Sequence, residues 1–195
     1  MLKDIPYAQG SPGSSGRHQR PTSTTSPRWY CLVPSPVGQL MLAGDFQRLT
    51  CLFFQDGPHT QPPPPHWTYD RNPFTKVIDQ LEEYFAGTRT QFTVPLEQKG
   101  TPFQQRVWRT LLNIPYGQTV SYGEIARSIG LPQASRAVGA ANGKNPISIL
   151  VPCHRVIGHS GKLVGYGGGL PIKEKLLAHE RQVLSQTSPV STLFG

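Results

Sequence analysis

Short runs of apolar and polar residues in the first half of the chain predict a small α/β unit. Residues 29–34, 38–44 and 48–54 have the composition of strands, with turn-forming residues between them. Apolar side chains then recur at helical spacing, and Gly87 ends the predicted helix. The pattern indicates core packing and no site chemistry in this half. The helical stripe consists of Phe74, Val77, Ile78, Leu81, Tyr84 and Phe85.

The second half of the chain predicts a series of short helices. Residues 101–104 combine an N-cap, a proline at the first helical position and a capping-box glutamine. Ser121 begins a second capping box whose helix ends at Gly130, and Pro132 begins a third helix that extends through Ala141. Two short helices joined by a tight turn are typical of a helix-turn-helix, although many helical pairs without a DNA partner share this pattern.

Small side chains cover much of the third predicted helix, so its surface can approach another surface closely. One interpretation is tight packing inside the protein, and the other is close approach to a DNA groove. Arg136 is the long cation in the middle of this helix, where a solvated charge or a phosphate contact is the simpler interpretation. The small residues are Ala134, Ala137, Gly139, Ala140 and Ala141.

An apolar run from Ile147 to Val151 predicts a buried strand, and Cys153 and His154 come just after it. A free thiol with a pKa of about 8.5 is mostly protonated at neutral pH, and a nearby base or cation shifts that balance towards the reactive thiolate. Because adjacent residues of a regular strand point to opposite faces, this pair can cooperate only through a turn or a water molecule. The alternative is a structural thiol, since free cysteine is among the most buried residue types.

Cysteine and apolar content restrict the class of protein. Three cysteines are too few for a disulfide framework, so we expect a reducing, cytoplasmic compartment; Cys31 and Cys51 fit buried structural thiols. Their spacing matches no metal site, and we predict no metal. No run approaches the roughly 18 apolar residues of a membrane helix, and the first residues lack the apolar core of a secretory signal.

Positive charge is concentrated in the second half of the chain. Residues 1–99 carry nine Lys/Arg and eight Asp/Glu, a net of +1, whereas residues 100–195 carry ten and three, a net of +7. This asymmetry favours a polyanionic partner, nucleic acid first, although a basic surface without such a partner gives the same count. Residues 1–27, rich in Pro, Gly, Ser and Thr, predict a disordered tail.

The run NPISILVPCHR, residues 145–155, closely resembles the active-site motif of the O6-alkylguanine-DNA alkyltransferases, also called methylated-DNA–protein-cysteine methyltransferases. The resemblance covers residues 101–181 and extends more loosely into the first half. Within the family, the chain resembles the bacterial-type branch. It implies an α/β, RNase H-like N-terminal domain at 28–97. A mostly helical C-terminal domain at 101–182 would carry a winged-helix-like helix-turn-helix and the active site, with a tail at 183–195.

The resemblance implies direct-reversal DNA repair. A methyl or other alkyl group would move irreversibly from O6-alkylguanine in double-stranded DNA to Cys153, once per molecule and without a cofactor. O4-alkylthymine stays open as a second substrate. The target base would flip out of the duplex, and the protein would act as a monomer associated with the nucleoid.

Three residues would carry the chemistry. Cys153 would accept the alkyl group, with its sulfur ionised at the bottom of a pocket. His154 would take the thiol proton through a water molecule, and Glu180 would orient the imidazole, which is the nucleophile–base–orienter logic of thiol enzymes.

The resemblance also implies residues that contact DNA and the flipped base. Arg136 would fill the gap left by the base, and Tyr122 would crowd the adjacent phosphate and hydrogen-bond the guanine. Asn145 would brace the turn that leads to the active-site segment. Val156 and Tyr166 would line the base pocket.

Gly167 marks a departure from the family pattern. Many relatives carry serine or another side chain there, whereas this chain has glycine within the run Gly165–Gly169. Glycine keeps the backbone N–H that would bind O6, so recognition survives while the width of the pocket changes.

Three other functions are compatible with parts of the pattern. A non-catalytic lesion sensor on the same frame would lack a nucleophile at position 153, where this chain has cysteine. A cysteine hydrolase would turn over many times on small esters or peptides without DNA. A transcription regulator would bind DNA and perform no chemistry.

Overall fold

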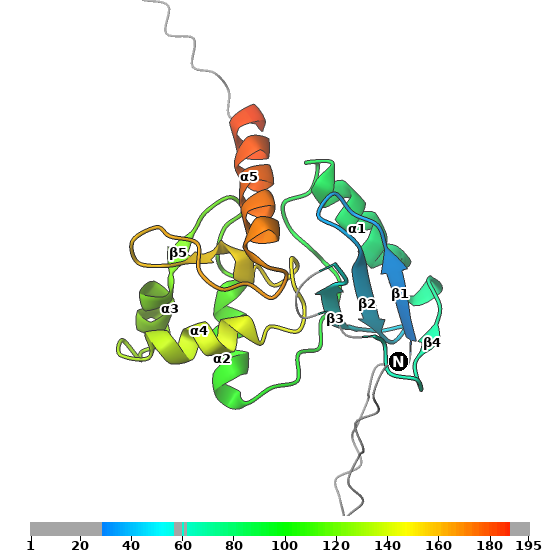
Figure 1. Ribbon diagram of the computed structural model, residues 1–195, viewed down its shortest axis with the longest axis horizontal. Helices are drawn as coiled ribbons and strands as arrows, with labels where there is room; N and C mark the ends of the chain where they lie inside the picture. The colour runs from blue at the N-terminus through cyan, green and yellow to red at the C-terminus, as the bar shows by residue number, and fades with distance from the viewer. Residues whose placement is uncertain (1–28, 57–59, 61, 188–195) are drawn as a thin grey trace, which may run out of the picture.

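The computed structural model describes residues 29–56, 60 and 62–187, and Figure 1 shows them as two unlike halves. A sheet with a helix against it forms one half, and a group of helices around a very short sheet forms the other. This arrangement confirms the predicted fold class, an α/β domain followed by a mostly helical domain with a helix-turn-helix. The tail predicted at 1–27 lies outside the described residues.

The N-terminal half contains a mixed sheet that, in the described part of the chain, has the strand order β3-β2-β1-β4. Neighbouring pairs β1–β2 and β2–β3 are antiparallel, whereas β4 runs parallel to β1. The three longer strands confirm the pattern-based prediction, and β4 was missed because two residues carry no periodicity. The strands are β1 (Trp29–Val33), β2 (Leu40–Gly44), β3 (Leu49–Phe54) and β4 (Thr68–Tyr69).

Helix α1 (Thr75–Phe85) follows a short 3-10 turn, η1 (Asn72–Phe74), and packs against this sheet as its apolar stripe predicted. It buries Val77, Ile78 and Leu81 in the core, and Tyr84 near its end is fully buried as well. Burial of such a stripe supplies most of the stability of a short helix.

The C-terminal half places a helix-turn-helix, α3 and α4, against helix α2. Both predicted capping boxes form: Thr101 caps α2 and Ser121 caps α3, each receiving the backbone N–H three residues on. The elements are α2 (Pro102–Leu111), β5 (Val120–Ser121), α3 (Tyr122–Ser128), α4 (Ser135–Gly143), η2 (Cys153–Arg155), β6 (Val156–Ile157) and α5 (Leu170–Thr187).

Two predicted elements differ in the structure. Helix α4 begins at Ser135 instead of Pro132, because residues 131–134 form a turn closed by the Ala134 N–H on the Leu131 carbonyl at 2.8 Å. Helix α5 continues through Thr187, five residues into the segment expected to be a tail. Its residues Val183 and Leu184 pack against Gly87 and Gly117, which explains why the helix extends so far.

The buried strand predicted from Ile147 to Val151 is wrong. Ile147 forms an isolated bridge with Leu52 of β3, and a turn follows in which Ile149 has a φ of 69°. A positive φ is unusual for a β-branched residue and costs of order 1–3 kcal/mol. The run is apolar because it is buried in the core that both halves share, and its pairing with β3 is limited to the bridge at Leu52 among the described residues.

One continuous core joins the two halves, with members from β1 to α5. Helix α5 stands between the helical half and α1 (Figure 1), and the His179 ring lies 2.8 Å from the backbone oxygen of Tyr84. Within the described ranges, none of the helices is both long and apolar enough for a membrane crossing.

Adjacent leucines at the end of α2 test this packing. Leu111 is fully buried, whereas Leu112 is 48% exposed. We expect Leu111→Ala to lower the free energy of unfolding by about 2–5 kcal/mol, because it leaves a cavity in the core. Leu112→Ala is the control and should stay within about 0.5 kcal/mol. Urea unfolding followed by fluorescence measures both, and equal losses would contradict this core.

Candidate active site

Cys153 begins η2, the 3-10 turn that follows the buried 147–151 segment. Its side chain is almost completely buried, and His154 next to it is fully buried. Because the two residues lie on a turn and not on a strand, their side chains are free of the strict alternation of a strand. The turn is one of the two arrangements in which the pair was expected to cooperate.

Asn145 holds the turn and touches the thiol. Its side-chain N–H₂ lies 2.9 Å from the Val151 oxygen, 3.2 Å from the Ile147 oxygen and 3.1 Å from Cys153 Sγ. Its Oδ1 accepts the Ile147 N–H at 3.1 Å. Two amide hydrogens thus serve three acceptors, and Asn145 supports the strained turn while donating towards the sulfur.

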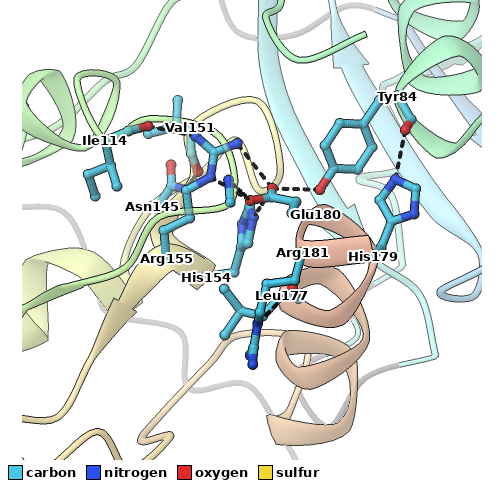
Figure 2. A network of polar contacts seen from close by, with 11 residues as sticks. Tyr84, Ile114, Asn145, Val151, His154, Arg155, Leu177, His179, Glu180 and Arg181 are labelled. Atoms are coloured by element: carbon cyan, nitrogen blue, oxygen red, sulfur yellow. Dashed lines mark hydrogen bonds and ion pairs between the residues drawn. The ribbon is translucent and has the colours of Figure 1, made fainter. Parts of the chain in front are cut away.

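Glu180 of α5 is fully buried and collects hydrogen bonds from several segments (Figure 2). His154 Nε2 lies 2.8 Å from Oε1, and Arg155 contacts both carboxylate oxygens, at 2.9 Å through Nε and 3.0 Å through Nη2. The Gly117 N–H donates to Oε2 at 2.9 Å, and the Tyr84 hydroxyl donates to Oε1 at 2.8 Å.

Protonation follows from this arrangement. Burial raises the pKa of Glu180, but hydrogen bonds and charge from His154 and Arg155 outweigh it and hold that pKa well below its usual range. An ionised Glu180 accepts from Nε2–H, so His154 presents Nδ1 as a lone-pair acceptor. Nδ1 is buried and, among the described residues, has no hydrogen-bond partner.

Burial favours the neutral form of the Cys153 thiol, whereas the sequence led us to expect an ionised sulfur. Burial raises the pKa of Cys153, and the opposing effects of the Asn145 hydrogen bond and the Lys173 charge are smaller. Burial likewise lowers the pKa of His154, against the pull of Glu180. Both pKa shifts favour a neutral thiol beside a neutral imidazole, so a thiolate forms when the thiol proton moves to the imidazole.

Lys173 is a buried cation close to this cluster. Its Nζ donates to the Val156 oxygen at 2.6 Å and to the Val164 oxygen at 2.9 Å, so it fastens both ends of the loop between them. Burial lowers the pKa of Lys173 to about 8, with Cys153 acting in the opposite direction. Its positive charge favours a negative charge on the sulfur.

Tyr122 and Arg136 lie outside the buried cluster, on a surface groove of the helix-turn-helix that His159 also lines. The Tyr122 hydroxyl donates to the Val164 oxygen at 3.3 Å, the same oxygen that Lys173 contacts. Arg136 is exposed on α4. The structure thus places Tyr122 between the groove and the active-site loop, and Arg136 at the groove alone.

Some of the small residues of α4 pack inside the protein, and others face outward, where another surface can approach closely. Ala141 is buried, and its oxygen accepts the Trp108 indole N–H at 2.9 Å. Ala137 and Ala140 face outward. Neither of the two interpretations of this helix therefore holds for its whole surface.

The remaining predicted site residues differ in how deeply they are buried. Val156 and Tyr166 are buried, whereas Gly167 is exposed, and a Cβ added there would meet no atom within 4 Å. Gly167 borders a cavity of about 340 Å³ whose other walls include β2, β3 and the Pro62–Trp67 segment. The cavity reaches Asn145 and Ser148 beside the active-site turn.

Sequence reasoning missed three residues of this site. Tyr84 was assigned to an apolar helical stripe, and its apolar neighbours gave no sign that its hydroxyl donates to Glu180. Arg155 and Lys173 lay within the family-like segments, but their spacing did not reveal that they are buried. A charged side chain in an apolar stretch is the signal that could have found the last two, since such residues are rarely buried unless paired.

In the described part of the chain, no three His, Cys, Asp or Glu side chains gather in a way that could hold a metal ion. The described cysteines are free thiols, and Cys31 and Cys51 lie in the sheet.

Comparison with known proteins places this two-domain, thiol-bearing helix-turn-helix protein in a family. The family model for the 6-O-methylguanine DNA methyltransferase DNA binding domain matches residues 102–182, and the model for its ribonuclease-like domain matches residues 29–98. The chain belongs to the 6-O-methylguanine DNA methyltransferase family.

Relatives and solved structures agree with this assignment. Methylated-DNA–protein-cysteine methyltransferases of Mycobacterium tuberculosis and Methanosarcina acetivorans are 56% and 51% identical over 152 residues, which is 78% of this chain and 92% and 97% of theirs. A crystal structure of Mycobacterium tuberculosis OGT in complex with DNA has a TM-score of 0.75 at 54% identity, covering 80% of this chain and 94% of that one.

Removing the charge of Glu180 tests the buried cluster. We expect Glu180→Gln to lower the free energy of unfolding at pH 7 by about 3–5 kcal/mol, because it leaves Arg155 buried without its partner. The folded-state pKa of Glu180 lies below its unfolded value of about 4.3, so its contribution is complete above that pH. As the pH falls below that value, the wild type loses this contribution progressively, and the gap to the variant narrows.

Urea unfolding between pH 7 and pH 3 measures that gap. Glu174→Gln, at an exposed position of the same helix, is the matched control and should stay within about 0.5 kcal/mol. A gap that stays constant over the whole pH range would show that the Glu180 charge is not coupled to the fold.

Proposed function

We propose that this chain is a direct-reversal DNA repair enzyme that moves a methyl or other alkyl group from O6 of guanine onto Cys153. The observation that carries the proposal is a buried cluster in which Asn145 donates to the Cys153 thiol and the adjacent His154 contacts Glu180, on the segment that follows the helix-turn-helix. The relatives named above are methylated-DNA–protein-cysteine methyltransferases, and the basic half of the chain suits a DNA partner.

The reaction starts from the neutral pair. His154 Nδ1 takes the thiol proton through a water molecule, and Glu180 stabilises the imidazolium that forms. The Sγ electron pair then attacks the alkyl carbon, and the pair of the breaking C–O bond stays on the guanine. The guanine anion takes a proton from the Tyr122 hydroxyl, and the proton released by the thiol returns from His154 to Tyr122 through water, so that the protons balance.

The product is a thioether on Cys153. A carbon–sulfur bond of this kind offers no leaving group to water, so the chain is consumed after one transfer. Lys173 and the Asn145 amide assist the step, because both favour negative charge on the sulfur as it forms. Residues with such perturbed pKa values are typical of functional sites.

DNA must deliver the base to a buried sulfur. The base leaves the duplex at a cost of a few kcal/mol, and Arg136 fills the gap and restores part of the stacking. Tyr122 begins the helix of the groove and reaches the active-site loop, which suits a residue that guides the nucleotide inward. Val156 and Tyr166 line the pocket, and the Gly167 N–H binds O6.

The cavity beside Gly167 supports alkyl groups larger than methyl. No side chain at position 167 closes the way from the active-site turn to the apolar walls formed by Phe53, Phe54 and Trp67. A bulky O6 substituent would lie in this cavity during transfer.

The domain division and the setting of the reaction are part of this proposal. Residues 28–97 would form the α/β domain and residues 101–182 the alkyltransferase domain, in a monomer associated with the nucleoid. The nucleoid setting follows from the proposed DNA substrate.

Label transfer tests the function directly. A duplex with radiolabelled O6-methylguanine should give its label to the protein, with a plateau at about one label per chain because the reaction has no release step. Peptide mass spectrometry should place the label on Cys153, and Cys153→Ser should remain unlabelled while it still binds the duplex. Many turnovers per chain, or hydrolysis of small esters without DNA, would instead identify a hydrolase.

Arg136→Ala tests base flipping. We expect it to slow transfer from duplex by about tenfold or more, because the extruded base can then return to the stack. Transfer from the free base O6-benzylguanine should change less than twofold, since no duplex has to be opened. Arg127→Ala, another exposed cation of the helix-turn-helix, is the control. Equal losses with both substrates would exclude this role for Arg136.

A further inference from the structure

Glu180 receives a hydrogen bond from the other half of the molecule. Tyr84, near the end of α1, is fully buried, and its hydroxyl donates to Glu180 Oε1 at 2.8 Å. Figure 2 shows this hydroxyl approaching the carboxylate from the side opposite to Arg155. The sequence pattern had placed Tyr84 in the apolar core, where a phenylalanine would serve equally well.

Contacts with α5 and with neighbouring aromatic rings fix the position of Tyr84. The ring of His179, which precedes Glu180, contacts the Tyr84 backbone oxygen at 2.8 Å. The Tyr84 ring also packs against His179, Phe92 and Tyr116, with ring centroids 5.2–5.9 Å away. A hydroxyl held in this way has little freedom to leave the carboxylate.

The donors on Glu180 compete for its charge. In the described part of the chain, Oε1 accepts from Tyr84, from His154 Nε2 and from Arg155 Nη2. Each donor draws negative charge from the oxygen and leaves less of it for the others. Tyr84 is a permanent donor, because burial and the Glu180 charge raise the pKa of its phenol well above the usual value.

We propose that Tyr84 is a positioning residue for alkyl transfer, through which the α/β half holds Glu180 and sets the basicity of His154. This inference rests on the proposed function. Tyr84 touches neither the thiol nor the base, and it acts through Glu180. The α/β half then contributes to the reaction as well as to stability.

The direction of the effect follows from the competition. Without the Tyr84 hydroxyl, Oε1 holds the His154 imidazolium more strongly, and the pKa of His154 rises. Because the resting pair is neutral, the acid limb of the pH–rate profile follows this pKa and moves to higher pH. The carboxylate also loses one of its restraints, so the maximal rate falls.

Tyr84→Phe in the full-length chain tests the inference with the free base O6-benzylguanine, which removes effects on DNA binding. We expect the acid limb of the pH–rate profile to move to higher pH by about half a pH unit. The plateau rate should fall roughly threefold to tenfold, the order of one lost hydrogen bond. Tyr69→Phe, at a 58% exposed position of the same half, should change neither quantity.

A second experiment strengthens the Tyr84 hydrogen bond and should shift the acid limb in the opposite direction. Incorporating 3-fluorotyrosine at position 84 keeps the contact and makes the phenol a stronger donor, so the acid limb should move to lower pH. Opposite shifts in the two proteins support the proposal. Unchanged pH profiles in both would overturn it, even if Tyr84→Phe were slower, because a purely structural role lowers the rate without moving the limb.

NMR titration of the His154 ring separates this inference from the proposed function. It uses Cys153→Ser, with and without Tyr84→Phe, and needs no alkyl transfer. A higher His154 pKa in the double variant supports the coupling, and an unchanged value contradicts it. Failure of wild-type label transfer would reject the proposed function alone.

Discussion

The buried carboxylate of Glu180 is the group on which the rest of the structure depends. A carboxylate without water is costly unless hydrogen bonds and opposite charge replace its hydration. Here Arg155, His154, Tyr84 and the Gly117 N–H supply them. Satisfying one ion therefore brings together α1, the turn after α2, the 3-10 turn with the thiol, and α5.

The same requirement sets the chemistry of the site. Because Glu180 is ionised, His154 must donate through Nε2 and keep Nδ1 free to accept a proton. Burial meanwhile raises the pKa of Cys153 and lowers that of His154, which favours the neutral form of both. A neutral thiol is less open to oxidation than a thiolate, so the same burial lowers the susceptibility of the sulfur to oxidation. For a protein consumed after one reaction, this protection has clear value.

Local sequence signals predicted the elements that depend on local physics. The capping boxes at Thr101 and Ser121 form as expected, and the three longer strands and α1 follow the apolar pattern. The 147–151 run is an element that such local signals did not predict correctly. Burial and β-branched residues indicated a strand, but a strand depends on a neighbour to pair with. Within the described ranges the segment forms a bridge with Leu52 of β3 and then turns at Ile149.

By itself, the sequence determined the nucleophile, its histidine neighbour, the helix-turn-helix and the family, because a short motif and its spacing are local properties. The tertiary structure decided the state of the thiol, since its pKa depends on burial that no pattern of neighbours reveals. It alone also connected Tyr84 with Glu180, which are 96 positions apart along the chain. Hydrogen bonds at that separation exist only after the two halves have packed around a common core.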